Sequence, residues 1–147
     1  MEIALKELRA ALACANELEK VSAAAAAFAG KLGFVLYQLA WLRQPPHSQY
    51  FLERPNFIGN FPAEWLERYW RRHYHNEDCI ARRCLISALP VAWDSSTAPT
   101  LNERQKRIAR EAASYGLAAG AAVSVRMHQG LFVAFVLARF SNSCAEV

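Results

Sequence analysis

Apolar residues recur at helical spacing in the N-terminal part of the chain. Between Glu2 and Gly30 most residues are Ala, Leu, Glu or Lys, which favour helices. Asn16 followed by Glu19 has the form of an N-cap and its partner, so we expect one helix to end there and a second to begin. Gly33 is expected to follow the end of the second helix. The pattern therefore predicts two consecutive helices.

The next stretch has the composition of strands. Aromatic and β-branched residues from Phe34 to Leu42 predict a first strand. The segment Arg43–Gln49, with its two prolines, predicts a turn, and Tyr50–Ile58 is expected to return as a second strand. Pro55 places this second strand at a sheet edge or a bulge, because proline has no N–H to donate.

Two more strands are expected near the C-terminus. Apolar and polar residues alternate from Ala121 to Met127, with Val123 and Val125 on one face and Ser124 on the other. Residues Leu131–Leu137 are apolar throughout, which is typical of a strand covered on both faces. A Gln-Gly pair between the two runs predicts a hairpin turn.

The middle of the chain carries aromatic residues at helical spacing. Pro62 suits the first turn of a helix, where its missing N–H costs nothing. Four side chains, each four residues from the next, are expected on one face of that helix: Phe61, Trp65, Tyr69 and His73. On the wet side Glu64 and Arg68 are expected to pair at the i,i+4 spacing, and a second helix is expected over Asp78–Ala88.

A last helix is expected before the C-terminal strands. Thr100 and Glu103 predict a capping box at its start, after a loop over Asp94–Pro99, and Gly116 is expected to end it. Helices that precede and separate antiparallel strands indicate an α+β fold in which helices and a sheet form layers.

Composition limits the possible classes of protein. The chain has 147 residues, enough for one domain, and its hydrophobic content of 54% excludes a disordered chain. It has no continuous apolar run long enough to span a membrane, so we expect a soluble, cytoplasmic protein. The 4 cysteines lack C-x-x-C spacing, which argues against a disulfide framework or a zinc ribbon.

The net charge of +4 is modest, but basic residues gather between Arg68 and Arg83 and between Arg104 and Arg110. Nucleic-acid-binding proteins show such clusters. No groove-entering motif accompanies them here, which favours solvated helix faces.

Metal binding and nucleophilic catalysis are two competing interpretations of the segment after the aromatic helix. Five side chains of metal-ligand type fall close together in the sequence: His73, His75, Asp78, Cys79 and Cys84. On a helix, however, a His-x-His pair points to different faces. A nucleophilic pair of Cys79 with His75 or with His73 lacks a third group to orient the histidine. We therefore expect neither a metal site nor an enzyme.

Four residues, with the motif N-F-P-x-x-W that opens at Asn60, carry a resemblance to a known family: Trp65, Tyr69, Asp78 and Trp93. Their spacing is similar to that of the signal-binding domain of LuxR-type quorum-sensing regulators, from about Leu32 to Phe140. The resemblance implies an α-β-α sandwich with a central antiparallel sheet of about five strands. It also implies a pocket for an acyl-homoserine lactone, the autoinducer, and no cofactor.

The resemblance implies roles for individual residues. The indole N–H of Trp65 would donate to the lactone carbonyl. Asp78 would accept from the amide N–H of the ligand. Tyr69 would flank the acyl chain, Trp93 would pack over the lactone ring, and Gly120 would begin a pocket strand where a side chain would intrude.

Three positions depart from the family pattern. Phe61 stands where the family commonly has a tyrosine that donates to the amide carbonyl, and Val136 where a Ser or Thr often adds a polar contact. Cys79 replaces the proline that usually follows the aspartate. Ile80 completes the predicted set of ligand-binding residues. A more apolar or differently substituted signal is therefore equally consistent with the sequence.

The resemblance also implies biological partners. We expect one autoinducer-binding domain over residues 1–147, C-terminally short and without a helix-turn-helix, acting as the sensory domain of a transcription regulator. It would form a homodimer, or a heterodimer with LuxR-type regulators, without binding DNA or membranes itself. One alternative is a stand-alone truncated protein that inhibits full-length regulators, with degenerate or no ligand binding. Another is an unrelated small-molecule enzyme on a similar sheet.

Overall fold

The computed structural model describes residues 1–43 and 56–140. The predicted turn over Arg43–Gln49, apart from Arg43, and the first part of the predicted strand Tyr50–Ile58, with Pro55, lie outside the described residues. The helices are α1 (Glu2–Ala13), α2 (Leu18–Lys31), α3 (Ala63–Arg71), α4 (Cys79–Ile86) and α5 (Glu103–Ser114). The strands are β1 (Leu36–Arg43), β2 (Asn56–Gly59), β3 (Val91–Trp93), β4 (Ala119–Arg126) and β5 (Leu131–Arg139). Short 3₁₀ segments are η1 (Tyr74–Asn76), η2 (Ser95–Thr100) and η3 (His128–Gly130).

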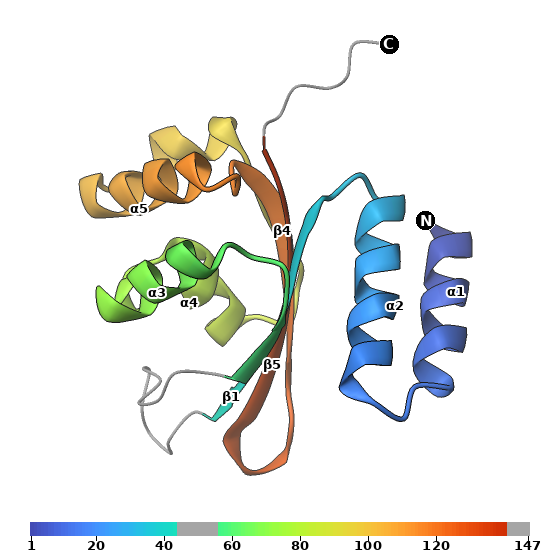
Figure 1. The fold of residues 1–147 in the computed structure, drawn as a ribbon. Coiled ribbons are helices and arrows are strands. Elements are labelled where there is room, and N and C mark those ends of the chain that lie inside the picture. Colours follow the sequence, from blue (N-terminus) through green and yellow to red (C-terminus); the bar gives the residue numbers. More distant parts are fainter. Residues whose placement is uncertain (44–55, 141–147) are drawn as a thin grey trace, which may run out of the picture.

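The strands form one antiparallel sheet in the order β2-β1-β5-β4-β3. The central pair, β1 and β5, is in register from Leu36 opposite Ala138 to Arg43 opposite Leu131. Helices α1 and α2 cover one face of the sheet, and α3, α4 and α5 lie over the other (Figure 1). The predicted α+β sandwich with a five-stranded antiparallel sheet is thus confirmed.

Strand β3 has no counterpart among the strands predicted from the residue pattern. It has 3 residues, and it pairs with β4 so that Trp93 lies opposite Gly120. Three residues are too few to show an alternation, so β3 is defined by its partner strand and not by its own sequence.

The break between the first two helices is confirmed, but its cap is not the predicted one. Helix α2 begins after Glu17, whose own side chain makes no capping hydrogen bond among the described residues. The side chain of Asn16 instead accepts a hydrogen bond from Lys20 Nζ at 2.7 Å.

The capping box of α5 also lies two residues beyond its predicted position. Asn102 and Gln105 exchange the two hydrogen bonds of the box. Thr100 belongs to η2, which occupies most of the predicted loop, and its hydroxyl donates to the carbonyl of Thr97. Its side chain is therefore engaged away from the helix.

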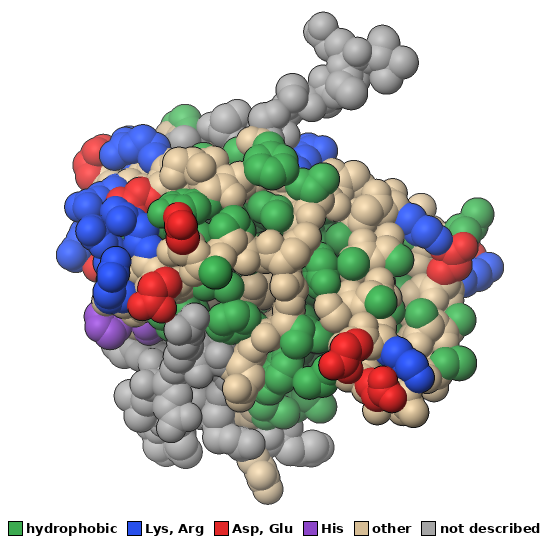
Figure 2. Space-filling view, viewed as in Figure 1, with side chains coloured by type: hydrophobic (Ala, Val, Ile, Leu, Met, Phe, Trp, Pro, Cys, Tyr) green, Lys and Arg blue, Asp and Glu red, His purple; other side chains and the backbone are tan. Residues whose placement is uncertain are grey.

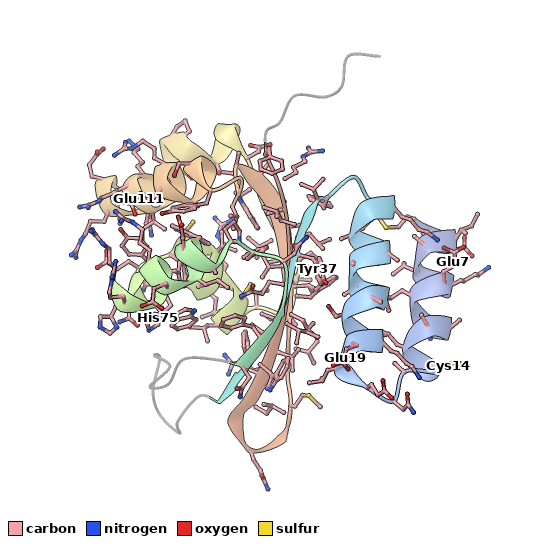
Figure 3. All side chains as sticks on the ribbon, in the orientation of Figure 1. Glu7, Cys14, Glu19, Tyr37, His75 and Glu111 are labelled. Carbon is pink, nitrogen blue, oxygen red and sulfur yellow. The ribbon has the colours of Figure 1, made fainter. Side chains whose placement is uncertain are left out.

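Small side chains let α2 pack closely on the sheet. Ala25 and Ala29 are buried against Tyr37 of β1 and Leu137 of β5. The hydroxyls of Tyr37 and Ser22 lie 2.7 Å apart in a hydrogen bond. Tyr37 is on the α2 side of the sheet, whereas His75 and Glu111 are on the other side (Figure 3).

The face of β4 that meets α4 is buried although it carries a polar residue. The polar residue Ser124 faces inward, only 3% exposed, and its hydroxyl donates to the carbonyl of Cys84 in α4 at 2.7 Å. The apolar residues Val123 and Val125 face outward and are exposed. The buried hydroxyl of Ser124 is accommodated because it supplies a hydrogen-bond partner to a carbonyl near the end of α4.

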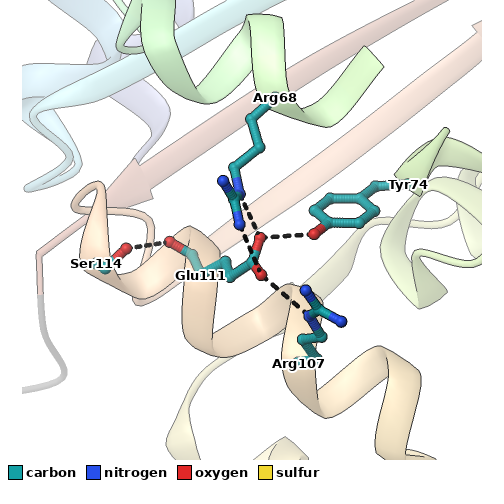
Figure 4. A network of polar contacts seen from close by, with 5 residues as sticks. All are labelled: Arg68, Tyr74, Arg107, Glu111 and Ser114. Carbon is teal, nitrogen blue, oxygen red and sulfur yellow. Dashed lines mark hydrogen bonds and ion pairs between the residues drawn. The ribbon is translucent and has the colours of Figure 1, made fainter. Parts of the chain in front are cut away.

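One carboxylate joins α3 to α5 (Figure 4). Glu111 accepts hydrogen bonds from Arg68 Nε at 2.7 Å, from the Tyr74 hydroxyl at 2.7 Å and from Arg107 Nε at 3.2 Å. The predicted pairing of Arg68 with Glu64 is therefore wrong. Arg68 bonds instead to Glu111 of another helix. The hydrogen bond from Arg68 lowers the pKa of Glu111 to about 2.

The outer surface of this helical layer is basic. Lys and Arg side chains gather where α3 and α5 lie (Figure 2). In the part of the chain that the structure describes, no helix is long and apolar enough to cross a membrane.

Candidate ligand-binding site

A cavity of about 540 Å³ lies between the sheet and the layer formed by α3, α4 and α5. Its size is within the range of small-molecule sites. Most of the side chains around it are apolar. The sheet contributes Gln38, Ala40, Ala122, Phe132, Ala134 and Val136, and the helices contribute residues such as Trp65, Leu66, Ile108 and Ala112. Such a cavity can take an elongated, largely apolar molecule.

Seven of the eight predicted site residues line this cavity: Phe61, Trp65, Tyr69, Asp78, Ile80, Trp93 and Val136. They come from α3 and the residues before it, the start of α4, β3 and β5. The eighth, Gly120, is not a lining residue. A Cβ atom there would lie 2.4 Å from the Trp93 ring and 2.2 Å from the carbonyl oxygen of Leu137. Gly120 thus makes room for Trp93 over β4.

Asp78 is held in a fixed orientation at the start of α4. Its Oδ1 accepts from the backbone N–H of Ile80 at 3.0 Å, which makes Asp78 the N-cap, and its Oδ2 accepts from the Tyr69 hydroxyl at 2.8 Å. Burial raises the pKa of Asp78, and these two hydrogen bonds oppose the rise because they favour the ionised form. The carboxylate is therefore an oriented acceptor in an apolar wall.

Trp65 is the centre of an aromatic cluster. It is 4% exposed, and its ring centroid lies 5.6 Å from those of both Tyr69 and Tyr115. The contact with Tyr69 is edge-to-face, a favourable geometry for aromatic pairs. Burial, followed by the nearby charge of Asp78, raises the pKa of Tyr69, so its hydroxyl keeps the proton that it donates.

His73 does not share the aromatic face, contrary to the prediction. Helix α3 ends at Arg71, and His73 has a φ of 55° in the left-handed region, with its side chain exposed. The chain then turns so that His75 is buried and stacks on Trp70, with ring centroids 4.5 Å apart. Both Trp70 and His75 line the cavity. Burial lowers the pKa of His75, which favours the neutral imidazole.

Gln38 lines the cavity although it is not among the predicted site residues. It lies on the cavity side of β1, 7% exposed, between apolar neighbours. The available signal was a single polar residue inside the run Leu36–Leu42, on the same face as Leu36 and Ala40.

The cysteines near the cavity have the properties of inert thiols. Burial raises the pKa of Cys79, and it raises the pKa of Cys84 to about 11. Thiols with a raised pKa are poor nucleophiles near neutral pH. Among residues 1–43 and 56–140, no group of three or more His, Cys, Asp and Glu side chains could hold a metal ion.

The chain matches the family described as autoinducer binding domain over residues 17–147. It is 34% identical over 120 residues to the transcriptional activator protein AnoR of Acinetobacter nosocomialis, covering 80% of this chain and 48% of that protein. It is 28% identical over 109 residues to the HTH-type quorum-sensing regulator RhlR of Pseudomonas aeruginosa, covering 74% of this chain and 42% of that protein. The chain thus spans about half the length of these relatives.

Solved structures show the same fold. CepR2 of Burkholderia cenocepacia, described as an N-acylhomoserine lactone dependent LuxR family transcription factor, superposes with a TM-score of 0.70 at 25% identity, over 95% of this chain and 76% of that one. SdiA in complex with octanoyl-rac-glycerol superposes with a TM-score of 0.73 at 17% identity, over 96% of this chain and 55% of that one.

Proposed function

This chain belongs to the autoinducer-binding domain family of LuxR-type regulators, and from that premise we propose that its cavity binds an acyl-homoserine lactone-like signal. The observation that carries the proposal is the cavity of about 540 Å³, which is lined mostly by apolar side chains and has the Asp78 carboxylate oriented on its wall. A long acyl chain fits the apolar part, and an amide N–H fits the acceptor.

The proposed contacts follow from the donor and acceptor properties of the lining residues. Asp78 accepts from the ligand amide, and the Trp65 indole, a donor only, pairs with the lactone carbonyl. Tyr69 flanks the acyl chain while it holds Asp78 in place. Trp93, whose ring lies in the space left by the missing side chain of Gly120, packs over the lactone ring.

The other proposed lining residues are apolar. Phe61, Ile80 and Val136 add no side-chain donor or acceptor, so they suit the acyl part of the ligand. The proposed ligand contacts are therefore polar at Asp78 and Trp65 and mainly apolar elsewhere.

A panel of acyl-homoserine lactones from short to long chains tests the proposal. A ligand that binds only the folded form stabilises it by about 2.7 kcal/mol at a hundredfold excess over Kd. For a domain of this size we expect the melting temperature to rise by roughly 5 to 10 °C, with one chain length giving the largest shift. A panel that shifts nothing in thermal unfolding or calorimetry contradicts lactone binding.

A sensor also returns its ligand unchanged. Mass spectrometry of the lactone recovered after long incubation with the protein should show the intact ring and amide. Recovery of an opened ring or a free fatty acid, at a rate above that of buffer alone, would favour an enzyme on this fold.

The proposal extends to a regulatory context. AnoR is described as a transcriptional activator and RhlR as a quorum-sensing regulator. We propose that this signal domain acts in the cytoplasm. It works either as part of a transcription regulator that forms a homodimer, or as a separate protein that forms a heterodimer with such a regulator. The domain does not itself bind a DNA operator. A footprint on a defined operator made by this chain alone would contradict that assignment.

A further inference from the structure

The side chain of Gln38 has an unusual environment. It is 7% exposed, it lines the cavity, and its Oε1 atom has no hydrogen-bond partner among the residues that the structure describes. Buried polar atoms in proteins almost always have a partner. An unpaired amide oxygen at a cavity wall therefore indicates a donor that enters the cavity.

The neighbours of Gln38 in the sheet cannot supply that donor. Its cross-strand partners are Gly59 of β2 and Val136 of β5, neither of which has a polar side chain. Ala40, two residues along β1, lies on the same face and also lines the cavity. A bound water needs two to four polar partners to be held well, and these side chains offer none besides Gln38.

Gln38 also lies apart from Trp93, which is proposed to pack over the lactone ring. The Trp93 ring reaches over Gly120 of β4. In the strand order β1-β5-β4, β1 is two strands further, or roughly 10 Å at the usual strand spacing. A ligand with its ring beside Trp93 would thus meet Gln38 with its acyl part.

We propose that Gln38 is a specificity-determining residue whose amide oxygen accepts a hydrogen bond from a hydroxyl group on the acyl part of the ligand. This inference rests on the proposed lactone binding. It adds that the acyl part of the ligand carries a hydroxyl group, a feature that the apolar residues Ala40, Ala134 and Val136 cannot recognise.

Three lactones of equal chain length test the assignment: octanoyl-, 3-hydroxyoctanoyl- and 3-oxooctanoyl-homoserine lactone. Each is titrated by calorimetry into the wild type, Gln38→Met and Leu39→Met. Gln38→Met removes the amide while keeping side-chain length. Leu39→Met is the matched control, because the next residue of a strand points to the opposite face of the sheet.

We expect the wild type to bind the hydroxylated lactone about fivefold more tightly than the unsubstituted one, the worth of one neutral hydrogen bond. Gln38→Met should bring that ratio close to one. Leu39→Met should keep the wild-type ratio. The ratio of the two affinities is informative, because a general loss of packing would lower the affinity for both lactones by the same factor.

Other outcomes would overturn the assignment. If the wild type binds octanoyl- and 3-hydroxyoctanoyl-homoserine lactone equally well, the assignment is wrong. It is also wrong if Gln38→Met still prefers the hydroxylated lactone. A Gln38-dependent preference for the 3-oxo lactone would show that the amide nitrogen donates, against the hydroxyl assignment. If the wild type binds none of the three or any other lactone of the panel, the proposed function fails and this inference fails with it.

Discussion

At the scale of single residues, Asp78 has a structural role and a proposed role in ligand recognition. It caps α4 through the N–H of Ile80 and accepts the hydroxyl of Tyr69, while it lines the cavity. Substitutions can separate the two roles, because Asn caps helices about as well as Asp but carries no charge.

Asp78→Asn should weaken lactone binding by about tenfold or more, since the ligand amide loses a charged acceptor. Its melting temperature without ligand should stay close to that of the wild type. Asp78→Ala should lose the cap as well and should lower the free energy of unfolding by about 1 kcal/mol. Calorimetry with the preferred lactone and thermal unfolding without it measure the two effects. Undiminished binding by Asp78→Asn would show that Asp78 is only a cap.

At the scale of elements, the wall of the cavity depends on how α3 is joined to α5. Glu111 makes this connection through Arg68 and Tyr74, and Arg107 of its own helix is a third donor residue. Because Arg68 lowers the pKa of Glu111 from 4.5 to about 2, the folded state favours the ionised carboxylate. Its stabilising contribution is complete above pH 4.5 and is lost as the pH falls through 2.

Glu111→Gln should therefore lower the free energy of unfolding at pH 7, by on the order of 1 kcal/mol for a partly exposed network. The difference from the wild type should shrink as the pH falls from 4.5 towards 2, as denaturant titrations at several pH values would show. Glu64→Gln is the matched control, because Glu64 is an exposed residue of α3 outside the network. A constant difference across this pH range would mean that the ionised state of Glu111 contributes nothing.

At the scale of the whole molecule, the sheet separates two helical layers, and only one of them borders the cavity. The cavity lies on the side of α3, α4 and α5, whereas α1 and α2 pack on the other face (Figure 1). Helix α1 has one buried residue, Ala4, and it lies against α2, where Glu7 forms an ion pair with Lys31. The family match begins at residue 17, after α1.

Deleting residues 1–16 should thus leave lactone affinity within about twofold of the wild type, because distant sites without shared partners behave independently. The melting temperature should fall, since α2 loses its neighbour. Asp78→Ala, which alters the cavity itself, serves as the contrasting variant. A folded deletion variant that no longer binds the preferred lactone would show that the α1 layer acts on the cavity through the sheet.

The sequence by itself determined the features that depend on near neighbours in the chain. Helix-forming composition predicts α1 and α2, and proline with aromatic residues four apart predicts α3. The spacing of Trp65, Tyr69 and Asp78 carried the resemblance that implied a pocket, and these residues lie within one helix and the cap of the next. Such elements follow from interactions over a few residues, which the sequence displays directly.

The tertiary structure alone decided the features that depend on contacts between distant segments. Strand β3 exists because β4 pairs with it, and Ser124 faces inward because the carbonyl of Cys84 receives its hydrogen bond. Arg68 turns to Glu111, 43 residues away, because that carboxylate accepts two further hydrogen bonds and is less exposed than a surface partner. Gln38 becomes part of the cavity only when β1 pairs with β5 beneath the helices. The free energy of each of these contacts appears only after folding brings the partners together.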